Sequence, residues 1–150
     1  DLILNHRAHG IFKANLVDFS VSNSRLHFVW ARALSGRLGN GMSYSSNLCW
    51  NTYPLPILTE KNIEDLTLCS EMILLARESH FPVTIADLYD PKAIPNNLLE
   101  AHKRNDEVLE RIYIGRRFKN DTERLEKLFE LYTKMTTADK AKPAKKAPKR

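Results

Sequence analysis

The residues of this sequence that could carry out chemistry are few. His6 and His9, in the segment HRAHG, have a spacing that two metal ligands can share, but no third ligand lies nearby in the sequence. The sequence contains no glycine-rich phosphate loop, no nucleophile elbow and no HExxH zinc motif. Cys49 and Cys69 stand alone without CxxC spacing, which predicts neither a disulfide framework nor a zinc site. We therefore expect no catalytic, cofactor-binding or metal-binding residue in this chain.

The segment NTYP, Asn51 to Pro54, is the one near match to a catalytic motif. It resembles the Asn-Pro-Pro-Tyr motif with which amino-group methyltransferases hold the amino group of a flipped adenine. Here Thr52 stands in the place of the first proline and Tyr53 comes one position early. The geometry would differ, so the segment is not predicted to be a catalytic site.

An uncharged stretch is the best candidate for a binding surface. After Arg37 no charged residue appears until Glu60, although 27% of the chain is charged. The interval is rich in Gly, Ser, Asn and aromatic residues, and Asn and Ser side chains and amides on glycine turns suit contacts with base edges and phosphates. The alternative is that its aromatic part packs on helices, as we expect for Trp50, Tyr53, Pro54 and Leu55.

The net charge of +5 comes from one end of the chain. The segment DKAKPAKKAPKR, residues 139–150, holds six of the 23 basic and one of the 18 acidic residues, so the other 138 residues carry 17 of each. Lys, Ala and Pro without periodic apolar residues cannot form a core, which predicts a disordered tail from residue 137 to 150. The tail is either simply solvated or adds nonspecific phosphate affinity that salt removes.

The length of 150 residues indicates one ordinary domain or two small units. With 43% hydrophobic residues and no apolar run of the roughly 18 to 20 residues that a membrane helix needs, the chain is expected to be soluble and without a membrane partner. The two isolated cysteines predict a reducing, cytoplasmic setting. It begins at Asp1 without a Met or a signal-peptide pattern, which suggests a piece of a longer protein.

Hydrophobic spacing predicts a mainly α fold: a small bundle of about four helices with a minor β or irregular N-terminal part. Residues 1–23 alternate weakly, at Leu2, Leu4, Leu16, Val17, Phe19 and Val21, which favours short strands. A first helix follows the cap Ser24, with Leu26, Val29, Trp30, Ala33 and Leu34 on one side and Arg25, Phe28 and Arg32 on the other, and Gly36 and Gly39 help to end it.

Three more helices are expected after residue 57. The first runs from the cap Thr59 to about Ser79 and buries Ile63, Leu66, Cys69, Ile73 and Ala76. The second runs from about Asn97 to Ile114, ends at Gly115 and buries Leu98, Ala101, His102, Asn105, Val108, Leu109 and Ile112. The third starts at a capping box of Asn120 and Glu123 and buries Leu125, Leu128, Phe129, Tyr132 and Met135. Residues 81–96, with three prolines, are expected to be ordered but irregular.

Three polar residues on these apolar faces need partners. Arg37 continues the face of the first helix, and a guanidinium there requires a carbonyl group, a carboxylate or a phosphate. A structural ion pair or carbonyl contact and a contact with DNA both remain open for Arg37. His102 is expected to be a hydrogen-bonded core or interface residue, and Asn105 is the second polar position of its helix.

Five segments in order carry a resemblance to a known family. They are FSVSNSRLHFVWARALSGRL, SYSSNLCWNTYPLP, the ADLYDP segment, LLEAHKRNDEVLERIYIG and ERLEKLFELYTKM. Over residues 19–136 the sequence resembles the C-terminal part of the large MmeI-like DNA adenine methyltransferases of restriction-modification systems. That family has a similar F-x-x-x-x-S-x-x-H-x-x-W helix, Gly-Arg-Leu, Arg-Tyr-Ser and Tyr-Asn-x-Phe-Pro-x-Pro, which close its target-recognition domain.

The resemblance implies a division of the chain and a function. Residues 1–56 would end the DNA target-recognition domain, residues 57–136 would form the helical C-terminal domain, and residues 137–150 would be a basic tail. The parent enzyme would transfer a methyl group from S-adenosylmethionine to adenine in a specific site of double-stranded DNA. This chain would be non-catalytic and would need the upstream methyltransferase domain of the same polypeptide as its partner.

The resemblance also implies DNA-binding residues. Arg37 and Leu38 match Gly-Arg-Leu, Tyr44 and Ser45 match Arg-Tyr-Ser, and the residues expected to contact DNA are Arg37, Asn40, Ser43, Tyr44 and Ser45. The sequence departs from the family where Ser43 replaces the Arg before Tyr-Ser, where Asn105 replaces an apolar residue, and where the basic tail is added. The loss of the Arg at position 43 bears on which DNA sequence is recognised.

A function of another class is an alternative. Phe28, Arg25 and Arg32 could form the exposed face of a stand-alone helical protein-interaction module, with the tail as a general polyanion-binding segment. DNA binding by a chain that ends at Thr136 separates the two hypotheses, because nonspecific affinity from the tail would vanish and site-specific affinity would remain.

Overall fold

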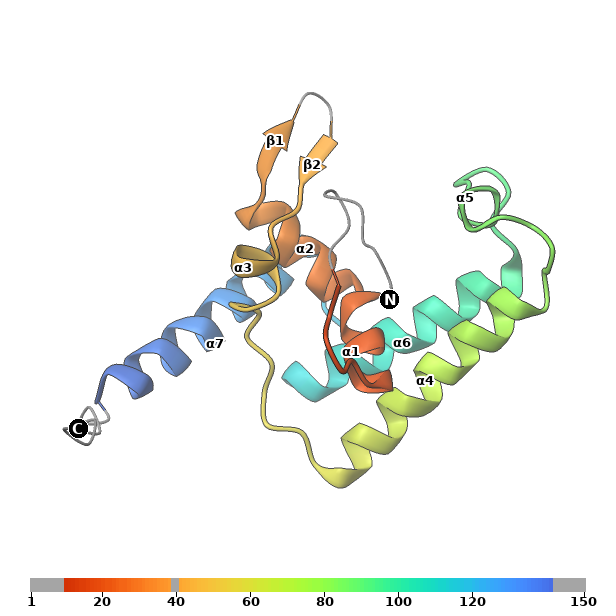
Figure 1. Cartoon of the computed structure of the whole chain (residues 1–150). Coiled ribbons are helices and arrows are strands. Elements are labelled where there is room, and N and C mark those ends of the chain that lie inside the picture. Colours follow the sequence, from red (N-terminus) through yellow and green to blue (C-terminus); the bar gives the residue numbers. More distant parts are fainter. Residues whose placement is uncertain (1–9, 39–40, 142–150) are drawn as a thin grey trace, which may run out of the picture.

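The computed structural model of the chain describes residues 10–38 and 41–141, with the side chains of residues 37–38 and 139–141 left out (Figure 1). The described part contains seven helices and one two-stranded antiparallel sheet. In chain order they are α1 (Leu16–Ser22), α2 (Arg25–Leu34), β1 (Gly36–Leu38), β2 (Gly41–Ser43), α3 (Ser46–Cys49), α4 (Glu60–Glu78), α5 (Ile85–Leu88), α6 (Asn96–Ile114) and α7 (Asp121–Ala141). The mainly helical fold is confirmed.

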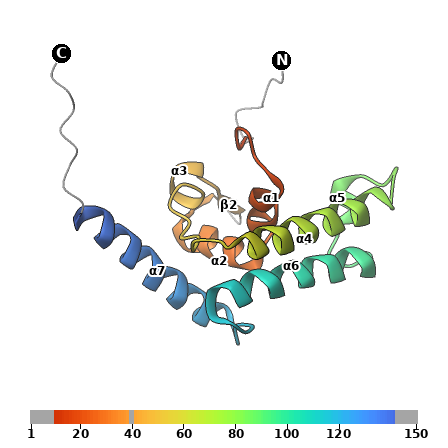
Figure 2. The ribbon, with the colours of Figure 1, turned by 90° about the horizontal axis from the view of Figure 1, so that it is seen from below.

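The helices α4 and α6 lie side by side and form the base of the molecule, and α1 packs on α4 (Figure 2). The helix α4 begins where the Thr59 side chain accepts a hydrogen bond from the amide of Asn62, whose side chain caps Thr59 in return. The helix α6 ends at Gly115, which adopts a left-handed conformation with φ of 75°. Both predicted boundaries are therefore confirmed to within one residue.

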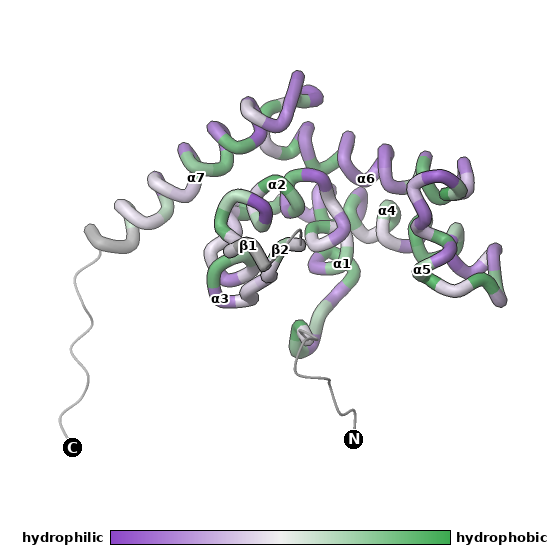
Figure 3. Tube along the Cα trace, turned by 90° about the horizontal axis from the view of Figure 1, so that it is seen from above, coloured by the Kyte–Doolittle hydropathy of each residue, from purple (hydrophilic) through white to green (hydrophobic). Residues whose placement is uncertain are grey.

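The second half of the core joins α2 to α7. Trp30 of α2 is buried, and its ring lies 5.0 Å from the ring of Phe129 and 5.6 Å from that of Tyr132 between centroids. Beyond this contact α7 extends away from the other helices (Figure 2). Hydrophilic and hydrophobic residues alternate along α6 and the first part of α7 (Figure 3), as expected where a helix has one buried face.

Two buried polar contacts tie α1 to its neighbours. Asn105 of α6 is fully buried; its Oδ1 accepts from the Ser20 hydroxyl at 2.5 Å and its Nδ2 donates to the Ser20 carbonyl at 3.0 Å. The Ser70 hydroxyl of α4 donates to the Leu16 carbonyl at 2.5 Å. Since buried polar groups without partners are costly, these bonds fix the position of α1 on α4 and α6.

The expectation of strands before residue 23 is wrong for the part that the structure describes. Residues 16–22 form α1, whose capping box joins Asn15 and Asp18. The buried positions Val17, Ser20 and Val21 have helical spacing, and the polar Ser20 hides this pattern in the sequence. Leu2 and Leu4 lie outside the described residues.

The first predicted helix ends earlier than expected. The helix α2 stops at Leu34 with Ser35 as its C-cap, and Gly36 begins β1 and does not end a helix. Arg37 is therefore a strand residue, so the extended helical face that would place it toward the core does not exist. Gly39 and residues 142–150 of the predicted tail lie outside the described part.

Four smaller expectations about the helices also need correction. The irregular segment 81–96 contains the short helix α5. Ile63, Phe129 and Met135 are partly exposed, and Ala33 faces solvent. In the last predicted cap, Asn120 Oδ1 accepts from the Glu123 amide at 2.9 Å, but the Glu123 carboxylate accepts from the Lys119 amide, one residue before the expected partner.

None of the helices in the described ranges is both long and apolar enough to cross a membrane.

Candidate nucleic-acid interface

The uncharged stretch forms a hairpin and a short helix that stand apart from the helical base (Figure 1). The strands β1 and β2 pair antiparallel, with Gly36 opposite Ser43, Arg37 opposite Met42 and Leu38 opposite Gly41. Ser43 is exposed and so is much of Met42. The hairpin thus presents its second strand to solvent.

A buried histidine anchors the base of the hairpin. His27 of α2 lies 95% buried, and its Nε2 makes a hydrogen bond of 3.1 Å with the Tyr44 hydroxyl. Its ring also lies against those of Trp50 and Tyr53, with centroid distances of 5.5 and 5.1 Å in edge-to-face arrangements. Because Tyr44 directly follows β2, this contact fixes where the hairpin leaves the body.

Burial decides the charge of this histidine. It lowers the pKa of His27 to about 4, since the charged imidazolium loses its hydration among aromatic rings. Burial likewise raises the pKa of the Tyr44 hydroxyl. Both groups are neutral at pH 7, so the bond between them is a neutral hydrogen bond that persists across the physiological pH range.

The NTYP segment is a packing element, as the sequence suggests. Thr52 Oγ1 donates to the Leu48 carbonyl and accepts from the Trp30 indole at 3.3 Å. The Tyr113 hydroxyl of α6 donates to the Pro54 carbonyl at 2.8 Å. Trp50, Tyr53 and Leu55 pack against the main core cluster, so the aromatic half of the stretch is structural.

A cleft of about 690 Å³ lies between the hairpin, α2 and the residues before α1. Met42, Tyr44 and Trp50 line one side, and Phe12 and Phe28 are among its other lining residues. Of the residues predicted to contact DNA, Tyr44 lines this cleft, whereas Ser43 and Ser45 are not among its lining residues.

The five predicted DNA-binding residues do not all lie within the described part. Ser43, Tyr44 and Ser45 are consecutive at the base of the hairpin: Ser43 is exposed, Tyr44 binds His27, and Ser45 is the N-cap residue of α3 without a side-chain capping bond. The side chain of Arg37 and the whole of Asn40 lie outside the described residues. His27 was not predicted as a site residue, although it is the His of the S-x-x-H-x-x-W pattern.

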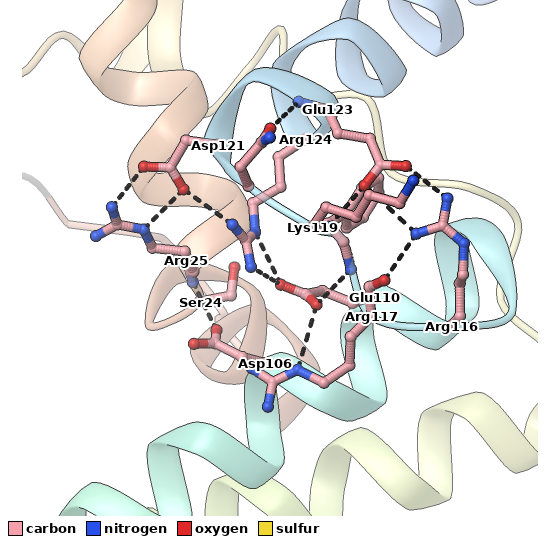
Figure 4. A network of polar contacts seen from close by, with 12 residues as sticks. Ser24, Arg25, Asp106, Glu110, Arg116, Arg117, Lys119, Asp121, Glu123 and Arg124 are labelled. Carbon is pink, nitrogen blue, oxygen red and sulfur yellow. Dashed lines mark hydrogen bonds and ion pairs between the residues drawn. The ribbon is translucent and has the colours of Figure 1, made fainter.

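A network of charged residues holds the support of the hairpin in place (Figure 4). Arg25 of α2 contacts Asp121 of α7 at 2.5 Å, and its amide donates to Asp106 of α6 at 2.6 Å. Buried Glu110 of α6 pairs with Arg124 of α7 at 2.6 Å. Three helices are joined by these bonds, which gives the hairpin a fixed base.

The same network involves Arg25, one of the residues of the alternative protein-interaction face. The guanidinium of Arg25, besides its pair with Asp121, stacks over the Phe28 ring at 5.0 Å from the centroid. Both residues thus make contacts within the chain, which weakens the hypothesis of an open protein-binding face there.

No metal site is found within the part of the chain that the structure describes: no three His, Cys, Asp or Glu residues are placed to share an ion. His6 and His9 lie outside that part. His102 is satisfied as expected, with its Nε2 2.6 Å from the Tyr89 hydroxyl.

Comparison with known families decides the relationship. Residues 58–138 match the family described as the MmeI C-terminal domain, and residues 1–57 match the MmeI target recognition domain. The chain belongs to the MmeI family. The hairpin lies in the part that matches the target recognition domain, and α4, α5, α6 and α7 up to residue 138 lie in the part that matches the C-terminal domain.

Two known proteins are similar to this member of the MmeI family. DNA methyltransferase A of Bacillus subtilis (strain 168) is 37% identical over 136 residues, which are 91% of this chain and 15% of that protein. The solved structure of the Type IIL restriction-modification enzyme MmeI in complex with DNA is 34% identical with a TM-score of 0.79, over 83% of this chain and 17% of that one. The chain thus spans about a sixth of the length of these relatives.

Proposed function

We propose that this chain is the DNA-reading end and the C-terminal support of a site-specific DNA adenine methyltransferase. Residues 1–56 would complete the target-recognition domain, residues 57–136 would form the helical C-terminal domain, and residues 137–150 a basic tail. The remaining polypeptide would hold S-adenosylmethionine and catalyse the transfer in the cytoplasm. This chain would be non-catalytic, because its sequence has no glycine-rich cofactor loop and no adenine-binding catalytic motif.

The observation that carries the proposal is the exposed hairpin, whose sequence from residue 36 to 43 has Arg37 as its single charged residue, in the part that matches the target recognition domain. Most protein–DNA affinity comes from cations on phosphates, whereas sequence is read by neutral donors and acceptors at base edges. The hairpin carries the Ser43 hydroxyl on an exposed strand, and Gly36 and Gly41 leave its backbone without side chains at two positions. These groups suit base reading and close approach to a phosphate backbone.

The proposed roles of the five residues differ. Ser43 would contact a base edge, and Arg37 and Asn40 would contact bases or phosphates near the tip of the hairpin. Tyr44 would position the strand through its bond to His27, with its ring bordering the cleft. Ser45 has a hydroxyl that does not cap α3, which leaves it able to contact a phosphate.

The test uses the complete polypeptide in a host whose own DNA lacks adenine methylation. Single-molecule sequencing of the host DNA gives the methylated motif of the wild type and of Ser43→Arg, which restores the arginine of the family pattern. The added guanidinium can make a bidentate contact with guanine, worth about 1–3 kcal/mol of discrimination. We expect Ser43→Arg to change the preferred base at one position of the motif.

Thr122→Arg is the matched control, because it adds the same group to an exposed position at the start of α7. It should leave the motif unchanged. If Ser43→Arg and the wild type methylate the same motif with the same preference at every position, the hairpin does not read DNA. If no adenine is methylated by any form, the proposed parent activity is wrong.

A further inference from the structure

The helix α4 has a second apolar row on the side turned away from the core. Leu68, Met72 and Leu75 follow each other at spacings of four and three residues and therefore share one face. Their exposed fractions are 57%, 42% and 64%. The buried residues of α4 lie on a different face: Leu66, Cys69, Ser70, Ile73 and Ala76. Apolar residues on two sides of a helix are typical of a helix that is buried on both of those sides.

The neighbouring helix α6 shows that this row is not a general feature of the fold. It has the same length of 19 residues, and no large apolar side chain of α6 is among the exposed ones. Its outer face instead carries ion pairs such as Lys103 with Glu100 at 2.7 Å and Arg111 with Glu107 at 2.6 Å. The outer face of α6 is thus polar and suited to exposure to solvent, whereas that of α4 carries exposed apolar side chains.

A row of carboxylates runs beside the apolar row of α4. Glu64, Glu71 and Glu78 are exposed and lie at intervals of seven residues, hence along one line on the helix surface. Within the described residues none of the three takes part in an ion pair. Glu60 and Glu126 are also unpaired there, whereas Glu100, Glu107, Glu110, Glu123 and Glu130 are paired. These three exposed carboxylates thus have no basic partner among the described residues.

We propose that this outer face of α4, comprising Leu68, Met72, Leu75 and the three glutamates Glu64, Glu71 and Glu78, docks onto the rest of the same polypeptide. Its partner is an apolar segment flanked by Lys or Arg. The inference rests on the proposed function, in which this chain is the end of a longer enzyme, and on the finding that it spans about a sixth of its relatives.

The charge of the face argues against other occupants. DNA and anionic lipid headgroups would be repelled by the glutamate row. A second copy docked through the same face would bring two glutamate rows together about a twofold axis, and facing like charges oppose association. An apolar segment flanked by Lys or Arg fits both rows, because its apolar residues would cover Leu68, Met72 and Leu75 and its cations would pair with the carboxylates.

The test measures whether the face is covered in the complete polypeptide. Met72→Cys is treated with a maleimide, and mass spectrometry of the peptide that contains position 72 gives the labelling rate. Thr122→Cys, at an exposed position of α7, is the control. We expect the thiol introduced at position 72 to react at least about tenfold more slowly, because labelling then requires a local opening. Equal rates at the two positions would overturn the proposal.

Two further measurements identify the occupant. Glu64→Lys with Glu71→Lys, added to Met72→Cys, should restore most of the labelling rate, whereas Glu126→Lys on α7 should not. A photoreactive amino acid in place of Leu75 should crosslink to a Lys- or Arg-containing peptide of the same polypeptide chain. A crosslink to a second copy or to another protein, or labelling that ignores the charge change, would refute the assigned partner.

These outcomes are separate from those of the methylation assay. Slow labelling of the Met72→Cys variant in a polypeptide that methylates no adenine would refute the proposed function and leave the docking intact. Methylation at a defined motif together with rapid labelling of the same variant would refute the docking alone.

Discussion

Substitution of Glu110 by alanine should destabilise the chain more than any other single change in its charged residues. The Glu110 side chain is fully buried, and Oε1 accepts from Nε and Nη2 of Arg124 at 2.8 and 2.6 Å. Its Oε2 accepts from the Phe118 amide at 3.0 Å and lies 3.6 Å from Nε of Arg117. One carboxylate therefore joins α6, the connection after it and α7 (Figure 4).

The expected cost follows from what the change leaves behind. Arg124, whose side chain is 12% exposed, would keep its ion pair with Asp121 at 3.0 Å and its contact with the Phe118 ring, and the Phe118 amide would lose its acceptor. Breaking a buried pair by removing one partner costs about 3–5 kcal/mol. Because Asp121 still balances part of the charge, we expect about 3 kcal/mol for Glu110→Ala.

The assay is urea unfolding of the 150-residue chain at pH 7. With a slope of about 2 kcal/mol per molar urea, the midpoint should fall by about 1.5 M at unchanged slope. The control Glu100→Ala removes an exposed pair with Lys103 and should cost less than about 1 kcal/mol. Replacing both partners, as Glu110→Met with Arg124→Leu, should recover much of the loss. If Glu110→Ala costs no more than the control, the network does not hold the helices together.

Three further predictions concern single residues that are buried or have an unusual backbone conformation. Because the unfolded state binds the proton of His27 at its ordinary pKa of 6.5 and the folded state only at about 4, this group's contribution is fully present above pH 6.5. Below pH 6.5 the unfolded state takes up a proton that the folded state does not, which lowers the free energy of unfolding by up to about 3 kcal/mol as the pH falls to 4. The free energy of unfolding should therefore fall more steeply between pH 7 and 4 for the wild type than for His27→Gln. Asn105→Ala removes both bonds to Ser20 and should cost about 2–3 kcal/mol in urea, and a further Ser20→Ala should add much less than it costs alone. Gly115→Ala should lower the free energy of unfolding by about 1 kcal/mol, because φ is 75°, whereas Gly36→Ala, which meets no neighbouring atom, should not; equal thermal shifts in the two variants would contradict this.

The parts of the fold that could be predicted are those with local signals. Thr59 and Gly115 mark helix ends through their own backbone chemistry, so α4 and α6 follow from the sequence. The helix α1 could not be found in this way, because its buried face includes Ser20, whose partner Asn105 lies 85 residues further along the chain. A polar core position becomes readable only when its partner is known.

The candidate site was located by the absence of charge between Arg37 and Glu60, but its construction was not predictable. The sequence does not show that Tyr44 returns to His27, because that contact depends on the turn between two strands. The apolar spacing of the first predicted helix continues past Leu34 and so predicts that Arg37 lies on a helix face. In the structure the backbone leaves the helix after Leu34. The helix α4 carries apolar residues on its core-facing side and on its outer side, and their spacing in the sequence does not show which of them are buried.

A genome-wide map of N6-methyladenine tests directly whether this chain directs methylation to a specific DNA site, as we propose. The complete polypeptide is expressed in a host without adenine methylation, alone and with the hairpin residues 36–43 replaced by a Gly-Ser turn. We expect methylation confined to one recurring motif for the intact protein and loss of that motif for the replacement. Methylation at the same motif without the hairpin, or no methylated adenine at all, would contradict the proposal.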